Sequence, residues 1–129
     1  MLLPRSTLEA IGLFDESFEM YYEDSDLCRR VRQAGLEIAV IPEAKVWHKI
    51  AASSGGSDSA AERYWMARSS IHYFRKHARG LQPAVILFWR SASALRTSLR
   101  LAAAGKWKAL QAYWRGLWHG LTDKTSRTP

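Results

Sequence analysis

Apolar side chains in the second half of the chain recur every three or four residues, which is the spacing of one side of an α-helix. Residues 61–79 predict a helix whose apolar side is made of Tyr64, Ala67, Ile71 and Phe74. Residues 84–104 predict a second helix, with an apolar stripe made of Val85, Phe88, Ala92, Leu95, Leu99 and Ala102. A third helix is expected over residues 106–121, where tryptophans are mixed with basic side chains.

The first half has a mixed pattern, in which short apolar runs separate helical segments. Residues 1–4 are typical of the end of a strand, and Ser6 with Glu9 predicts a capping box that opens a short helix closed by Gly12. Residues 24–34 predict a second helix, with acids in its first turn, arginines towards its end and Gly35 after it. Residues 36–42 predict a buried strand stopped by proline, and residues 44–48 a second extended piece. This order predicts an α/β fold followed by a helical tail.

Charge also divides the chain into two halves, which meet near residue 61. Residues 1–61, the acidic half, carry 6 basic and 10 acidic side chains, a net charge of −4, whereas residues 62–129, the basic half, carry 13 basic and 2 acidic, a net charge of +11. Residues 51–59, rich in serine and glycine, are expected to form a mobile loop between the halves. We therefore expect an α/β part over residues 1–61, a basic amphipathic helical extension over residues 62–121 and a disordered tail over residues 122–129.

Size and cysteine content limit the possible classes of protein. The 129 residues form at most one domain. The single Cys28 excludes an internal disulfide framework and favours a reducing compartment. No signal peptide is evident, because the apolar run at residues 1–3 is short and is followed at once by proline and arginine.

The most unusual stretch is residues 14–30, where six carboxylates and four aromatic residues precede an arginine pair. A solvated acidic loop gains nothing from so many rings, because burying each one stabilises a fold by roughly 1.5–3 kcal/mol. The stretch is therefore expected to be packed, with its acids converging. Carboxylates held together in this way attract a cation, a metal ion or a transferable proton. The stretch thus predicts a catalytic cleft.

The order of motifs along the first 50 residues resembles a known enzyme family. The matching motifs are Gly12-Leu13-Phe14-Asp15-Glu16-Ser17-Phe18, Tyr22-Glu23-Asp24-Ser25-Asp26-Leu27-Cys28-Arg29-Arg30, Ala34-Gly35, Pro42-Glu43-Ala44 and Trp47-His48. Together they resemble the C-terminal half of the catalytic domain of family 2 inverting glycosyltransferases, in particular the rhamnosyltransferase-like branch. A looser similarity extends to Tyr64, Arg68 and the Arg75-Lys76-His77 cluster.

This resemblance implies a partial GT-A glycosyltransferase fold and a function. The chain would supply the acceptor half of an enzyme that transfers a sugar from a nucleotide-diphosphate donor to a glycan or lipid-linked acceptor, in cell-envelope polysaccharide synthesis. Such an enzyme would work at the cytoplasmic, inner face of the cell membrane, as a peripheral protein. Donor sugar, acceptor and linkage vary on one scaffold, so the sequence does not identify them.

Five residues take roles from the resemblance. Asp24 matches the base that removes a proton from the acceptor hydroxyl, a role suited to a carboxylate at the start of a helix. Capping of that helix is the alternative role for Asp24, and the two are compatible. Glu23, beside Asp24 in the catalytic pair, is expected to position the acceptor or the loop. Asp26, Arg29 and Arg30 are expected to position the acceptor or the loop, with Asp26 capping the helix or pairing with one of the two arginines.

His48 matches the family's metal-holding histidine, which implies a divalent Mn²⁺ or Mg²⁺ ion in the complete enzyme. The alternative is a surface histidine at the end of a strand. His72, His77 and His119 are assigned no functional role. In the family, the donor pocket and an Asp-x-Asp motif precede the matched region. Asp24-Ser25-Asp26 has the same residue pattern as that motif, but it lies inside the matched region. The chain is therefore expected to lack a complete nucleotide-sugar site.

The basic half leaves two interpretations open. Tryptophans interleaved with lysine and arginine favour an anionic membrane surface as a partner, while the same stripes could instead pack on the catalytic domain. The segment over residues 84–104 carries too many charges to span a bilayer. A non-catalytic basic module that binds a membrane surface is the alternative function. Nucleic acid is not expected as a partner, because no recognised motif for it is present.

Overall fold

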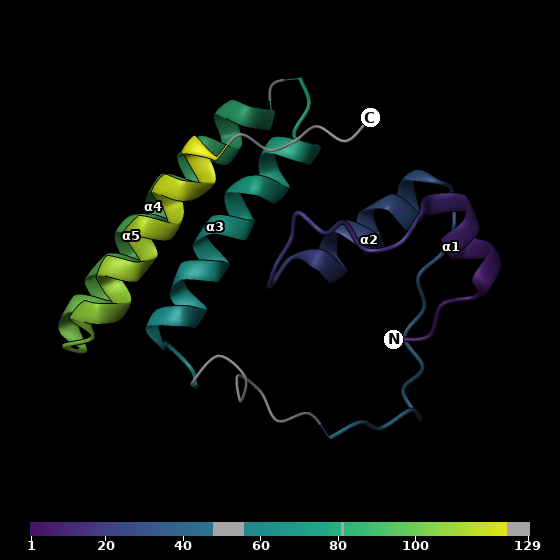
Figure 1. Ribbon diagram of the computed structural model, residues 1–129, viewed down its shortest axis with the longest axis horizontal. Helices are drawn as coiled ribbons and strands as arrows, with labels where there is room; N and C mark the ends of the chain where they lie inside the picture. The colour runs from purple at the N-terminus through teal and green to yellow at the C-terminus, as the bar shows by residue number, and fades with distance from the viewer. Residues whose placement is uncertain (48–55, 81, 124–129) are drawn as a thin grey trace.

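A computed structural model describes residues 1–47, 56–80 and 82–123. Its helices, in chain order, are α1 (Arg5–Ile11), α2 (Glu23–Gln33), α3 (Ala60–His77), α4 (Gln82–Ala103) and α5 (Trp107–Thr122). Figure 1 shows α3 in the middle, with α4 and α5 on one side of it and α2 and α1 on the other. Each helix that the sequence predicts is present, and its ends lie within three residues of the expected ones.

Close packing of α3 against α5 forms the centre of the basic half. Ala67, Tyr113 and Leu117 are buried together in this contact. Gly116 and Gly120 allow it, because a Cβ atom at Gly116 would overlap the carbonyl oxygen of Tyr64 and one at Gly120 would lie 2.8 Å from the Cβ atom of Ile71. The predicted apolar side of α3 is therefore confirmed as the side that packs on α5.

α4 packs on the other two helices through only one of its sides. Leu101 is fully buried on that side. Arg90 donates a hydrogen bond to the Ser70 hydroxyl of α3 over 2.7 Å. The predicted apolar stripe of α4 lies elsewhere, and its large side chains are exposed. The expectation that this stripe could be core packing is therefore not met among the described residues.

The helices of the acidic half have the predicted boundaries but one different cap. α2 begins with acids in its first turn and ends with Arg30 and Arg32, a charge order that suits the helix dipole. Gly35 follows it with a φ of 74°, a conformation that favours glycine. The capping box of α1 was predicted wrongly: the backbone carbonyl of Pro4 accepts from the amides of Thr7 and Leu8, and no side chain caps the helix.

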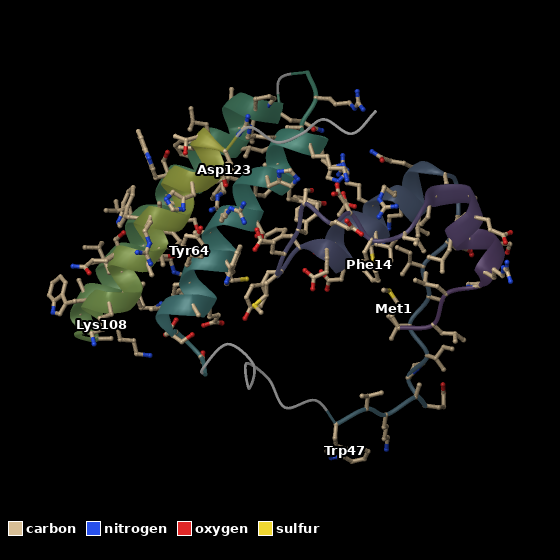
Figure 2. The ribbon with its side chains drawn as sticks, in the orientation of Figure 1. Met1, Phe14, Trp47, Tyr64, Lys108 and Asp123 are labelled. Atoms are coloured by element: carbon tan, nitrogen blue, oxygen red, sulfur yellow. The ribbon has the colours of Figure 1, made fainter. Side chains whose placement is uncertain are left out.

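The predicted α/β class, with its partial GT-A fold, is wrong for the described part of the chain. Residues 36–40 adopt no regular secondary structure, and neither do residues 43–47, so no strand or sheet occurs in the described ranges. A strand exists only by pairing its backbone groups with a neighbouring strand, and no second extended segment pairs with residues 36–47 in those ranges. Apolar side chains there face solvent, with Val40 87% and Trp47 89% exposed; Figure 2 shows Trp47 pointing away from the helices.

The boundaries between the predicted parts remain predictions. Residues 48–55, which hold most of the expected mobile loop, lie outside the described residues, and so do residues 124–129 of the expected tail. The end of the loop region is ordered: the Ser59 hydroxyl accepts a hydrogen bond from the amide of Glu62 and caps α3. No helix in the described ranges combines the length and apolarity needed to cross a bilayer.

Candidate functional site

The acidic-aromatic stretch folds back onto α3. Phe18 is buried, with its ring edge-on to the ring of His72 at a centroid distance of 4.6 Å. The Ser69 hydroxyl of α3 donates to the carbonyl oxygen of Met20 over 2.7 Å. Phe14, in contrast, is 49% exposed. The expectation of a packed stretch is confirmed for Phe18, and the packing surface is the middle of α3.

Asp26 is the best-paired group of this region. Its side chain has no solvent exposure and accepts from Arg30 Nε over 2.8 Å, from Lys76 Nζ over 2.7 Å and from His77 Nε2 over 2.7 Å. Burial alone would raise the pKa of the Asp26 carboxyl, but the bonds from Lys76, Arg30 and His77 outweigh burial and lower it. The predicted pairing of Asp26 with an arginine of α2 is confirmed by its contact with Arg30.

Asp15 joins the same network through Lys76. The Lys76 ammonium lies 2.6 Å from the Asp15 carboxylate as well as beside Asp26. Burial tends to raise the pKa of Asp15, yet the bonds from Lys76 and Ser17 dominate and hold it well below its usual range. The Ser17 hydroxyl lies 2.7 Å from Nε2 of His72, whose own pKa is lowered, chiefly by burial. Among the described residues, two of the six acids, Asp15 and Asp26, therefore converge as predicted, with a lysine of α3 between them, and the other four do not join them.

Arg30 extends the network to α1. Its guanidinium donates to the carbonyl oxygens of Ile11 over 2.5 Å and of Leu13 over 2.7 Å, at the end of α1. The same side chain bonds to Asp26. Arg30 and Asp26 thus tie together α1, α2 and α3. Their expected role in positioning an acceptor stays a prediction, and the contacts show how they position the loop between Gly12 and Tyr22.

Asp24 lies in a very different environment, although it is only two residues from Asp26. It is exposed in the first turn of α2, on a different side of the helix from buried Asp26. One of its carboxylate oxygens accepts from the amide and the hydroxyl of Ser25, over 2.6 and 3.2 Å. In the part of the chain that the structure describes, Asp24 forms no ion pair. Its carboxylate is held in place and open to solvent.

The backbone before Asp24 is strained. Tyr21 and Tyr22 have φ values of 65° and 70°, the left-handed region that bulky residues rarely adopt. Such conformations cost about 1–3 kcal/mol each and cluster at functional sites. Beside them, Oε2 of Glu23 is buried without a hydrogen-bond partner among the described residues. The backbone conformation of these two tyrosines sets the direction in which α2 begins, and therefore the position of Asp24.

An open cavity of about 500 Å³ lies along the side of α2 that carries Ser25. Its lining comes from α2, α3 and the extended segment, and consists of Ser25, Cys28, Arg29, Arg32, Gln33, Ile38 and Tyr73. Nε of Arg29 is buried there without a hydrogen-bond partner in the described ranges. The cavity therefore offers two guanidinium groups next to the helix turn that holds Asp24.

The predicted metal ligand, His48, lies outside the described residues. Among the residues that are described, no three histidine, cysteine or carboxylate side chains gather as metal ligands do. The two converging acids, Asp15 and Asp26, already bind Lys76, so they do not fit a metal-binding role. Dependence on Mn²⁺ or Mg²⁺ stays a prediction.

Sequence reasoning missed the partners of the acids. His77, to which we assigned no function, is buried against Asp26, and His72 contacts Ser17. His119 hydrogen-bonds to the Tyr64 hydroxyl between α5 and α3, over 2.8 Å. The Arg75-Lys76-His77 cluster belonged to the looser part of the resemblance, which gave no sign of a contact with the acidic stretch.

Comparison with known proteins gives a partial likeness. A stretch of 55 residues is 42% identical to the N-acetylglucosaminyl-diphospho-decaprenol L-rhamnosyltransferase of Mycobacterium tuberculosis, in strain CDC 1551 / Oshkosh and in strain ATCC 25618 / H37Rv. The stretch covers 43% of this chain and 18% of each relative. No protein-family profile matches the chain, and no solved structure matches it. The likeness supports a glycosyltransferase-like identity at this coarse level.

Proposed function

We propose that the chain forms the acceptor-binding and proton-abstracting part of an inverting, family 2 glycosyltransferase of cell-envelope polysaccharide synthesis. The enzyme would move a sugar from a nucleotide-diphosphate donor to a lipid-linked or glycan acceptor. The observation that carries the proposal is the contrast between Asp24 and Asp26, because one carboxylate of α2 is held open to solvent while the other is buried and bonded to three partners. The named relatives are sugar transferases, which agrees with the proposed reaction.

The chemistry assigned to Asp24 needs only one free carboxylate oxygen. In an inverting transfer the acceptor hydroxyl attacks the anomeric carbon from the face opposite the departing nucleotide diphosphate, and it gives up its proton as the new bond forms. Ser25 bonds to one oxygen of Asp24 and leaves the other for this proton. The left-handed backbone at Tyr21 and Tyr22 sets where α2 begins, at Glu23, one residue before Asp24.

The cavity beside Asp24 suits an anionic acceptor. The relatives' acceptor, by name, carries a diphosphate between its sugar and its lipid. A guanidinium group binds phosphate oxygens with two parallel hydrogen bonds, and Arg29 and Arg32 line the cavity without an ion-pair partner among the described residues. We assign the diphosphate group of the acceptor to this cavity, with its sugar hydroxyl towards Asp24.

A chimeric enzyme tests the role of Asp24. Residues 1–80 of this chain, which include α3 with Lys76 and His77, would replace the corresponding stretch of the mycobacterial rhamnosyltransferase, and transfer of labelled sugar to the lipid acceptor would be measured. Asp24→Asn is expected to lower turnover by about two to four orders of magnitude with little change in donor binding. Glu16→Gln, at an exposed acid of the preceding loop, is the matched control and should retain turnover. Equal turnover in the two variants would refute the proposal.

A further inference from the structure

The large side chains of the α4 stripe face solvent. Val85, Phe88, Leu95 and Leu99 are 55%, 68%, 62% and 63% exposed. They follow one another at steps of three, seven and four residues, so they lie on one side of the helix. Scattered exposed apolar residues need no explanation, but a continuous row of them marks an interaction surface.

α5 carries a second row of the same kind. Trp107, Trp114, Trp118 and Leu121 are 60%, 52%, 65% and 60% exposed and follow at steps of seven, four and three residues. The opposite side of α5 carries Gly116 and Gly120, which touch α3. This row therefore points away from α3.

The two rows belong to one surface. The indole N–H of Trp114 donates to the Ser98 hydroxyl of α4 over 3.1 Å, so the α5 row reaches across to α4. In Figure 1, α4 and α5 lie together on the side of α3 that faces away from α1 and α2. We call the surface formed by Val85, Phe88, Leu95, Leu99, Trp107, Trp114, Trp118 and Leu121 the outer face.

The charge around the outer face has one sign. Residues 82–122, which span α4 and α5, contain six lysine and arginine residues and no aspartate or glutamate. Arg100 and Lys106 are paired with Asp58. Arg96 and Lys108, on α4 and α5, form no ion pair with any described residue. The outer face therefore combines apolar rows and tryptophans with uncompensated positive charge.

We propose that the outer face binds the surface of an anionic lipid bilayer, with α4 and α5 lying in the plane of the membrane. Tryptophan is favoured at the boundary between headgroups and acyl chains, and basic side chains gain from nearby anionic headgroups. No described helix could cross the bilayer, which agrees with a surface position. A second copy of the chain is a poorer occupant, because two such faces would bring like charges together. This inference goes beyond the proposed transfer activity and stands independently of it.

Vesicle flotation of the full chain tests the proposal. The chain should float with mixed phosphatidylglycerol–phosphatidylcholine vesicles at low salt and bind weakly to pure phosphatidylcholine. Binding should fall as salt rises, because the Debye length contracts from about 30 Å at 0.01 M to about 10 Å at 0.1 M. Equal binding to both kinds of vesicle, or none to the anionic vesicles at low salt, would overturn the proposal.

Point variants separate the apolar and charged contributions. Deletion of α4 and α5 is unsuitable, because α5 supplies Tyr113 and Leu117 to the core. Trp118→Ala should weaken the vesicle partition about tenfold. Its control is Trp47→Ala, which removes a still more exposed indole from the acidic half and should leave the partition unchanged. Equal effects of the two tryptophan variants would count against the outer face.

Charge is tested in the same way. Arg96→Gln with Lys108→Gln should weaken binding to anionic vesicles by about fivefold for each charge removed. Arg5→Gln with Lys45→Gln removes the same charge from the acidic half and serves as the control. Sedimentation of each variant would reveal self-association. A stable dimer that Trp118→Ala dissociates and that does not float would assign the outer face to a second copy and refute the membrane proposal. The chimera contains neither α4 nor α5, so its turnover reports on Asp24 alone.

Discussion

The two halves of the molecule are held together by different kinds of interaction. In the basic half, α3 and α5 approach so closely that glycine is required at Gly116 and Gly120, and Ala67, Tyr113 and Leu117 fill the contact. The acidic half also buries large apolar side chains, namely Phe18, Leu27 and Val31, but the contacts that join it to α3 are mainly hydrogen bonds and ion pairs. The comparison teaches that the contact between α3 and α5 should resist changes of pH, whereas the attachment of the acidic half should not.

The largest expected effect comes from removing the charge at the centre of those contacts. Asp26→Asn leaves the cations of Arg30 and Lys76 facing a neutral amide in a buried site. Breaking one side of a buried ion pair costs about 3–5 kcal/mol. The loss should lie at the lower end of that range, because Lys76 keeps Asp15 and Arg30 keeps the carbonyl oxygens of Ile11 and Leu13 as partners. We expect urea unfolding to show that loss and hydrogen exchange of α2 amides to rise far more than exchange in α5.

Glu16→Gln controls for the loss of a negative charge in the same half, because Glu16 is exposed and is expected to change stability by less than 0.5 kcal/mol or so. If Asp26→Asn were as mild as Glu16→Gln, the acidic half would be held by its apolar contacts, and the contrast between the halves would disappear.

Acid should weaken the attachment of the acidic half by a smaller amount. The folded-state pKa values of Asp15 and Asp26 lie below their unfolded value, which is about 4, so the ionised groups add stability above that pH. This contribution is lost as pH falls through the folded-state values. The loss is smaller than for Asp26→Asn, since a protonated carboxyl still forms hydrogen bonds.

Hydrogen exchange followed from neutral pH to below pH 4 or so measures this difference, with rates corrected for their intrinsic pH dependence. Amides of α2 should lose protection first, while amides at the α3–α5 contact keep theirs. Simultaneous loss in both halves would mean that the acids stabilise the whole chain, not its attachment.

The close approach of α3 and α5 predicts the next effect. Gly116→Ala adds a Cβ atom that would overlap the carbonyl oxygen of Tyr64, so the helices must move apart. Overpacking of this kind costs about 1–3 kcal/mol, in spite of alanine's better helix propensity. Thermal unfolding should show the loss, and Gln111→Ala, at an exposed position of the same helix, should change the melting temperature little. A neutral Gly116→Ala would show that the contact can relax.

The sequence predicts the helices of this structure well and its extended segments poorly. Helices depend on apolar spacing and on residues within a few positions, so the boundaries of α2 to α5 follow from the sequence within three residues. A strand needs a partner that local sequence does not name, and residues 36–42 have none in the described ranges, so the α/β expectation failed. The alternation of Leu36, Ile38 and Val40 shows a preference for extended backbone, not the presence of a sheet.

Local sequence identifies some residues of the candidate site and not others. Asp24 and Asp26 stand out in the sequence by their place at the start of a helix, and their environments differ as sharply as two roles require. The partners of Asp26 on α3 could not be foreseen, because Lys76 and His77 lie 50 and 51 residues further along the chain. Nothing local distinguishes a lysine that will pair with two acids from one that pairs with none.

The smallest predicted effect concerns a single neutral hydrogen bond between the halves. The Ser69 hydroxyl is nearly buried and donates to the carbonyl oxygen of Met20, just before the strained tyrosine pair. Ser69→Ala removes this donor and leaves the carbonyl oxygen without it, which costs about 1 kcal/mol. Ser70→Ala, on the same helix, is a matched substitution that removes a hydroxyl bonded within α3 and to Arg90. Both variants should lose similar stability in urea, but only Ser69→Ala should raise hydrogen exchange at Tyr21 and Tyr22. Equal exchange there in the two variants would show that the tyrosine conformation does not depend on α3, and that the start of α2 is fixed within the acidic half itself.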